Sequence, residues 1–163
     1  MKLGKAVELV LESEEDLAEK LAKLAGRHAN EHDVYQLGHT LAERSREHLA
    51  KLRPFAEDLG ADTPDLEAGA ETRGPVDALR RVAGTVLGRS EVTGMLLLLD
   101  LRDAYLNAQG AEINWVILLQ TAKAARHVDL ERVATQCHEE AEGTGKWLRT
   151  RIKETTPQVL ATS

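Results

Sequence analysis

The sequence has few aromatic residues and a single cysteine. Phe, Trp and Tyr together make up 3% of the 163 residues, which leaves little of the aromatic material that favours β-strands. Cys137 has no second cysteine with which to form a disulfide within the chain. Its position on a helical apolar stripe indicates a buried, inert thiol rather than a nucleophile. These shortages argue against a sheet-rich fold and against a disulfide scaffold.

The chain also lacks long basic and long apolar runs. Its formal net charge is −6, so we expect neither nucleic acid nor an anionic membrane surface as a partner. The longest apolar runs, at 95–99 and 115–119, are too short to cross a bilayer. The N-terminal segment lacks the apolar stretch of a signal peptide. We therefore expect a cytoplasmic protein.

The residues that are abundant are those of a helical domain. Leu, Ala, Glu, Lys and Arg dominate, and hydrophobic residues make up 42% and charged residues 29% of the chain. This composition is typical of a soluble globular chain that is rich in helix formers. We expect residues 1–163 to form a single domain, since this length is sufficient for one hydrophobic core.

Four segments carry apolar residues at spacings of three and four, which places each set on one face of a helix. Asp33 and Asp129 are the expected N-caps of the second and fourth helices. Gly60 is the expected end of the second helix and Pro157 that of the fourth, with a frayed tail over 156–163. We expect the four helices over about residues 5–27, 34–59, 91–126 and 129–154.

The lengths of the connections indicate the topology. The first and second helices are joined by a short turn, as are the third and fourth, so each pair is antiparallel. Residues 60–90 form a long crossover, with an additional short helix over about 75–90 that begins at Pro75. One long crossover is the ferritin-like arrangement, whereas a simple up-down bundle uses short loops throughout. We therefore predict an all-α, ferritin-like four-helix bundle.

An acid or a histidine interrupts each apolar stripe near its middle. Counting 1.5 Å per residue from the turns places Glu14 and His48 at one height. The same count places Glu112 and Glu140 within about one turn of each other. An ionised group on a core face is costly unless it is paired or binds a metal. We therefore predict one polar layer in mid-bundle that contains Glu14, His48, Glu112 and Glu140.

With these residues the chain resembles the ferritin-like superfamily of di-iron carboxylate proteins. That family uses one Glu from each of two helices and Glu-x-x-His from each of the other two. The resemblance implies that Glu14 and Glu112 are the single Glu ligands, that His48 is the second-helix ligand and that Glu140 is the fourth-helix ligand. The segment 108–112 also looks like the third helix of a bacterial, stress-associated branch of the superfamily.

Two positions depart from the family pattern. Ser45 stands where the second-helix motif has Glu, and Gly143 stands where the fourth-helix motif has His. We therefore predict a degenerate di-iron site in a non-catalytic or weakly metal-binding protein, with Fe, Mn or Zn as the candidate ion. The alternatives are a metal-dependent oxidoreductase, which would oxidise iron or reduce peroxide, and a helical partner-binding module. Enzyme activity, a homodimer and a protein partner stay open.

The polar layer also has an explanation without a metal. Acids are dense around Glu14 and Glu140, so one of them falls on any chosen helix face. A core histidine is more often a hydrogen-bonded structural residue than a ligand. On this alternative, Glu–His hydrogen bonds hold the layer, together with Arg102 or water.

Other histidines are weaker candidates. His138 and Glu142 are four residues apart and could chelate a surface ion, although such a pair more often supports its own helix. His28, His32 and His127 fall in the two turns, and we expect them at the surface.

Overall fold

The computed structural model describes residues 2–63 and 89–161. These two ranges contain four α-helices and no strand, which confirms the predicted all-α class. The predicted short helix at 75–90 lies outside the described residues, except that Arg89 and Ser90 belong to the third helix of the bundle. The helices are α1 (Leu3–Arg27), α2 (His32–Leu59), α4 (Arg89–Ala124) and α5 (Val128–Leu160).

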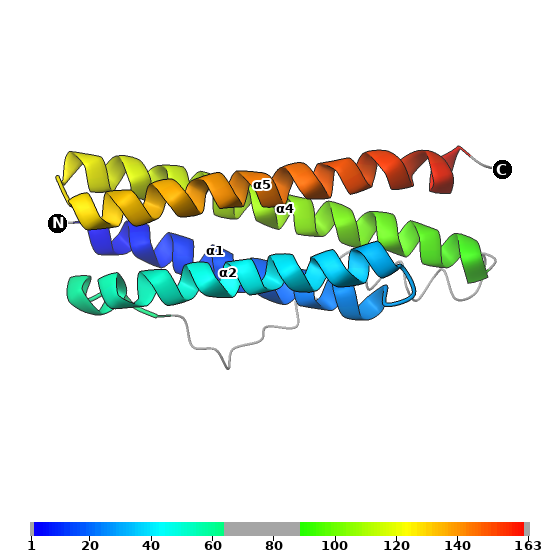
Figure 1. Ribbon diagram of the computed structural model, residues 1–163, viewed down its shortest axis with the longest axis horizontal. Helices are drawn as coiled ribbons and strands as arrows, with labels where there is room; N and C mark the ends of the chain where they lie inside the picture. The colour runs from blue at the N-terminus through cyan, green and yellow to red at the C-terminus, as the bar shows by residue number, and fades with distance from the viewer. Residues whose placement is uncertain (1, 64–88, 162–163) are drawn as a thin grey trace.

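The helices lie side by side as a four-helix bundle (Figure 1). In the described ranges α1 packs against α2 and α4, and α5 packs against α4 and more lightly against α2. Helices α2 and α4 therefore lie on one diagonal, and α1 and α5 lie on the other. The start of α1, the end of α2 and the α4–α5 turn share one end of the bundle. As a result α2 and α4 run in the same direction, and the end of α2 and the start of α4 lie at opposite ends.

The predicted apolar stripe of α1 is buried over its whole length. The stripes of α2 and α5 also face the core, with Leu52 and Leu148 fully buried. The core has two apolar clusters, one around Leu52 and Trp115 and the other around Leu21, Leu101 and Leu148. Glu14 on α1 and His48 on α2 fall between these clusters along their helices, and Glu140 on α5 lies at the edge of the cluster around Leu52 and Trp115. The bundle therefore has a polar layer near the border of two apolar halves.

The apolar spacing of the third segment predicts a core face that includes Tyr105, Glu112 and Val116, and this face is wrong by a small rotation of α4. Those three residues are only partly buried. The residues that are buried instead include Ala104, Ala111, Trp115 and Leu118. The buried face of α4 consists of Leu97, Leu101, Ala104, Ala108, Ala111, Trp115, Leu118 and Ala122.

Several helix ends differ from the predictions. Gly60 ends α2 in the left-handed conformation, with φ of 61°, as expected. Asp33 is not the N-cap of α2, because that helix begins one residue earlier at His32, after Glu31. Helices α1 and α4 each begin two residues before the predicted start, and α4 ends two residues before its predicted end.

The predicted ends of the last helix are also wrong. The N-cap of α5 is His127 rather than Asp129, and its Nδ1 accepts from the backbone N–H of Leu130 at 3.3 Å. Pro157 lies inside α5, which continues to Leu160, so residues 156–160 are helical rather than frayed. Residues 162–163 lie outside the described ranges. A proline removes one backbone donor, and packing of the last turn against the start of α4 outweighs that loss.

The helices of the described ranges include none with an apolar stretch long enough to span a bilayer.

The close contact between α1 and α2 gives a testable prediction. A Cβ added at Gly38 would lie 2.9 Å from Cβ of Ala25 and 3.2 Å from the carbonyl oxygen of Leu21. We expect Gly38→Ala to lower the free energy of unfolding by about 1–3 kcal/mol, because the two backbones must move apart. The matched control is Gly26→Ala, whose Cβ would meet nothing within 4 Å. It should raise stability by about 0.5 kcal/mol through helix propensity. Urea unfolding of both variants measures the difference, and equal effects would contradict the close contact.

Candidate functional site: two histidine–carboxylate clusters

One imidazole joins three helices in the middle of the bundle. Nδ1 of His48 lies 2.8 Å from Oε1 of Glu14, and its Nε2 lies 2.8 Å from Oε2 of Glu140. Nε1 of Trp115 on α4 donates to the same Oε1 of Glu14 at 2.6 Å. We call Glu14, His48 and Glu140 the buried layer. Glu14 and His48 are each 1% exposed, so water does not compete for their hydrogen bonds.

The proton count of the buried layer follows from its geometry. An ionised carboxylate only accepts hydrogen bonds, so when both acids are ionised both ring nitrogens of His48 donate and the ring is an imidazolium. Burial favours the neutral ring, but the hydrogen bonds and negative charges of Glu14 and then Glu140 outweigh burial. The pKa of His48 is therefore raised above its ordinary value of 6.5.

The two carboxylates of the buried layer have different surroundings. Burial tends to raise the pKa of Glu140, but the hydrogen bond and charge of His48, with the charges of Lys51 and Arg44, outweigh it. The pKa of Glu140 is therefore lowered from 4.5. Oε2 of Glu14 is buried and has no hydrogen-bond partner among the described residues. The two side chains that bond to Glu14, His48 and Trp115, both reach its other oxygen.

Three of the four predicted layer residues, Glu14, His48 and Glu140, are joined by hydrogen bonds. The fourth, Glu112, takes no part in these bonds. Glu112 bonds to His138 instead, because the rotation of α4 turns Trp115 toward Glu14 and Glu112 toward α5. The hydrogen bond of Glu112 is therefore to His138 and not to the other three residues, while the role of the four as metal ligands stays a prediction. Arg102 is also no part of it, since its ion-pair partner is Asp103 at 3.8 Å and its side chain is 63% exposed.

The buried layer has the hydrogen bonds of the structural alternative. His48 uses each nitrogen for a different carboxylate, so its two partners lie on opposite edges of the ring. Within residues 2–63 and 89–161, ligand atoms of these three side chains do not gather within 4.8 Å of one another. The candidate ligand atoms of the buried layer lie on different sides of the His48 ring. They therefore do not surround a common point.

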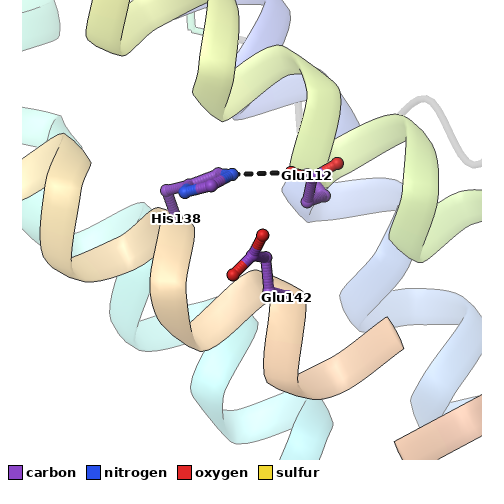
Figure 2. Close-up of side chains that lie close together, drawn as sticks. All are labelled: Glu112, His138 and Glu142. Atoms are coloured by element: carbon purple, nitrogen blue, oxygen red, sulfur yellow. Dashed lines mark hydrogen bonds and ion pairs between the residues drawn. The ribbon is translucent and has the colours of Figure 1, made fainter. Parts of the chain in front are cut away.

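A second cluster lies between α4 and α5, nearer the surface (Figure 2). Nε2 of His138 lies 2.6 Å from Oε1 of Glu112, and both side chains are 19% exposed. Glu142 follows His138 by one helical turn, and its carboxylate points toward the other two side chains. One ligand atom from each of the three lies within 4.8 Å of the others. We call Glu112, His138 and Glu142 the surface trio.

The surface trio has the chemistry of a site for a divalent ion. One imidazole nitrogen and two carboxylates suit Zn²⁺, Mn²⁺ or Fe²⁺. Three protein ligands leave further coordination positions to solvent. The spacing of His138 and Glu142 was visible in the sequence as a weak candidate pair. The third member, Glu112, is a predicted metal ligand, but the sequence pairs it with Glu14, His48 and Glu140 rather than with His138 and Glu142.

The turn histidines are not all at the surface. His28 is 5% exposed, and its Nε2 lies 2.7 Å from Oδ2 of Asp100 on α4. Nη1 of Arg27 lies 3.3 Å from the other oxygen of Asp100. The expectation that His28 is a surface residue is therefore wrong, since this contact joins the end of α1 to the start of α4. The position of Asp100 directly after the apolar run 95–99 could have indicated a buried acid that needs a partner.

Cys137 is buried, as predicted. Burial raises the pKa of its thiol to about 12, so the thiolate nucleophile is scarce at neutral pH.

Comparison of this chain with known protein families, with curated protein sequences and with solved structures finds no match.

The buried layer predicts a pH dependence of stability. His48 holds its proton more tightly when folded, so its contribution is complete below 6.5 and is lost as pH rises through its raised pKa. The free energy of unfolding should therefore fall between pH 6.5 and that raised pKa, with a slope of at most about 1.4 kcal/mol per unit. His48→Leu should be less stable by about 3–5 kcal/mol at pH 6, because Glu14 loses its cationic partner, and its slope should be smaller.

Urea unfolding between about pH 6 and pH 9, with a chelator present, measures both slopes. His39→Leu is the control, since His39 is exposed on α2 and lies outside both clusters; its slope should equal that of the wild type. Identical slopes for wild type and His48→Leu would show that His48 has no raised pKa.

Proposed function

We propose that this protein is a ferritin-like bundle that binds one divalent metal ion weakly at the surface trio and does not carry out di-iron oxidase chemistry. The observation that carries the proposal is the convergence of Glu112, His138 and Glu142, with one ligand atom from each within 4.8 Å of the others. A stress-associated role is part of the proposal through the resemblance of residues 108–112 alone.

The helix directions support the ferritin-like part of the proposal. Helices α2 and α4 run parallel, and the end of α2 and the start of α4 lie at opposite ends of the bundle. One long crossover requires this arrangement. A bundle with short loops throughout would place α2 and α4 antiparallel. The polar layer in mid-bundle also agrees with the resemblance, because Glu14, His48 and Glu140 come from three different helices.

The donor set argues against a dinuclear centre in the core. Ser45 and Gly143 supply no strong ligand, and His48 already bridges two carboxylates. A metal at His48 would have to replace a proton that two carboxylates stabilise. Glu112 is engaged by His138 on a different side of α4. The core donors therefore favour a structural layer, and the half-buried trio is the better place for an ion.

The local structure explains why binding at the trio should be weak. Glu112 and His138 are held against each other, but Glu142 is exposed and its carboxylate must be ordered by the ion. Water completes the coordination, since the chain brings three ligand atoms together here. A dedicated structural zinc site, in contrast, has four protein ligands.

Metal titration of the purified chain tests the proposal. Calorimetric titration with Zn²⁺, Mn²⁺ and, without oxygen, Fe²⁺ should give about one equivalent per chain for the preferred ion. His138→Ala should weaken binding by at least about tenfold, because it removes the only imidazole of the trio. The matched control is His39→Ala. His39 and Glu43 have the same spacing on α2, but Glu43 pairs with Arg46, so this variant should bind like the wild type.

Three outcomes would overturn the proposal. Two equivalents of iron per chain with oxygen consumption would support a metal-dependent oxidoreductase instead. Loss of binding in His48→Leu, with binding kept in His138→Ala, would place the ion in the buried layer. Equal binding by wild type and His138→Ala would remove the trio as a site.

A further inference from the structure

Helix α4 carries apolar residues on the side that faces away from the bundle. Leu106, Ile113 and Ile117 are 49%, 51% and 43% exposed, although each is a large hydrophobic residue. Single exposed hydrophobic residues are normal on a protein surface. These three, however, follow one another along a single face of one helix, so they form a continuous apolar stripe.

The stripe has the spacing of a coiled-coil seam. Together with Gly110, its residues are spaced by four, three and four, and a polar residue extends the pattern at each end: Asp103 three residues before and Gln120 three residues after. Alternation of three and four is the period at which two helices stay in contact. We call Asp103, Leu106, Gly110, Ile113, Ile117 and Gln120 the outer seam.

The outer seam is complementary to itself when two copies run antiparallel. A two-fold axis midway between Gly110 and Ile113 places Gly110 opposite Ile113 of the second copy. The same axis places Leu106 opposite Ile117, and Asp103 opposite Gln120. The smallest residue then faces a large one, apolar faces apolar, and a carboxylate faces an amide that can donate to it.

A parallel pairing does not have this complementarity. It would place Asp103 opposite Asp103 and Gly110 opposite Gly110, which puts like charges together and leaves a gap at the centre. In the antiparallel pairing the acid also comes near Lys123 of the second copy, one helical turn from Gln120. The order of residues therefore selects one direction and one register.

The central glycine is not required by packing within the chain. A Cβ at Gly110 would meet nothing within 4 Å, although glycine in mid-helix costs about 1 kcal/mol relative to alanine. Room for an isoleucine on a facing helix accounts for a small residue at this position. This observation is independent of the apolar stripe and points to the same occupant.

We infer that the outer seam of α4 is a dimerisation surface, and that its occupant is the outer seam of a second copy of this chain in antiparallel orientation. The seam from Asp103 to Gln120 is about 26 Å long at 1.5 Å per residue. A contact between two such helices is small compared with stable interfaces. The dimer is therefore weak, with a dissociation constant in the range of about 1–100 µM. It does not depend on the surface trio, which faces α5.

Sedimentation measurements from about 1 µM to about 500 µM, with a chelator present, test the dimer. The wild type should shift from monomer to dimer. Ile113→Glu should raise the dissociation constant at least about a hundredfold, because it buries a carboxylate near the two-fold axis. Tyr35→Glu is the control: Tyr35 is a large exposed residue on α2, the helix that lies diagonally across the bundle from α4. It should dimerise like the wild type.

Gln120 variants test the register. Gln120→Lys places a cation opposite Asp103 and should tighten the dimer about threefold to tenfold, whereas Gln120→Glu places an acid there and should weaken it by a similar factor. A wild type that stays monomeric throughout overturns the proposal. A change of the same sign in both Gln120 variants overturns the antiparallel register. A loss of monomer stability in Ile113→Glu would mean that the chain covers its own seam, which also overturns the proposal.

Discussion

The structure depends on one buried imidazole that is shared by two carboxylates. His48 on α2 bonds to Glu14 on α1 and Glu140 on α5, and Trp115 on α4 donates to Glu14, so all four helices meet at one height. These bonds have fixed directions, whereas apolar contacts do not. Burial of such charges contributes little net stability, because desolvation offsets their attraction. Its main effect is to set the rotation of each helix, and above all of α4. With Trp115 turned inward, Glu112 must face α5.

The sequence predicted the inward faces of three helices and failed on the fourth for a physical reason. On α1, α2 and α5 the apolar residues lie mainly on one side, so periodicity alone identifies the core face. Helix α4 is apolar on opposite sides, with Ala104, Ala108 and Ala111 facing the core and Leu106 and Ile113 facing outward. Several of its inner residues are small and several of its outer residues are large, so hydrophobicity does not distinguish the faces. Residue counting sets the height of a side chain along a helix, but an error of one residue rotates it by about 100°.

The remaining errors concern local contacts that periodicity does not contain. His28 follows the last residue of α1, where a histidine is ordinarily exposed, and its burial depends on Asp100 far along the chain. Pro157 stays helical because the last turn of α5 packs against α4, with Cγ2 of Val159 3.1 Å from the position of a Cβ on Gly94. In both cases a long-range contact overrides a sound local preference. Gly60 was predicted correctly because its left-handed conformation is itself a local requirement.

The two histidine–carboxylate clusters each contain one histidine and two glutamates, but they differ in how readily they could bind a metal ion. In the buried layer both nitrogens of His48 are used and the ring carries a proton that two acids stabilise. A divalent ion would add charge to a site where Glu14 is 1% exposed, and it would break the link between helices. In the surface trio the ring of His138 has one carboxylate partner, and Glu142 is exposed and can turn toward an ion. An ion there would replace the hydrogen bond between His138 and Glu112 and would bridge the same two helices. Burial, rather than ligand identity, therefore separates the structural cluster from the one available for metal chemistry.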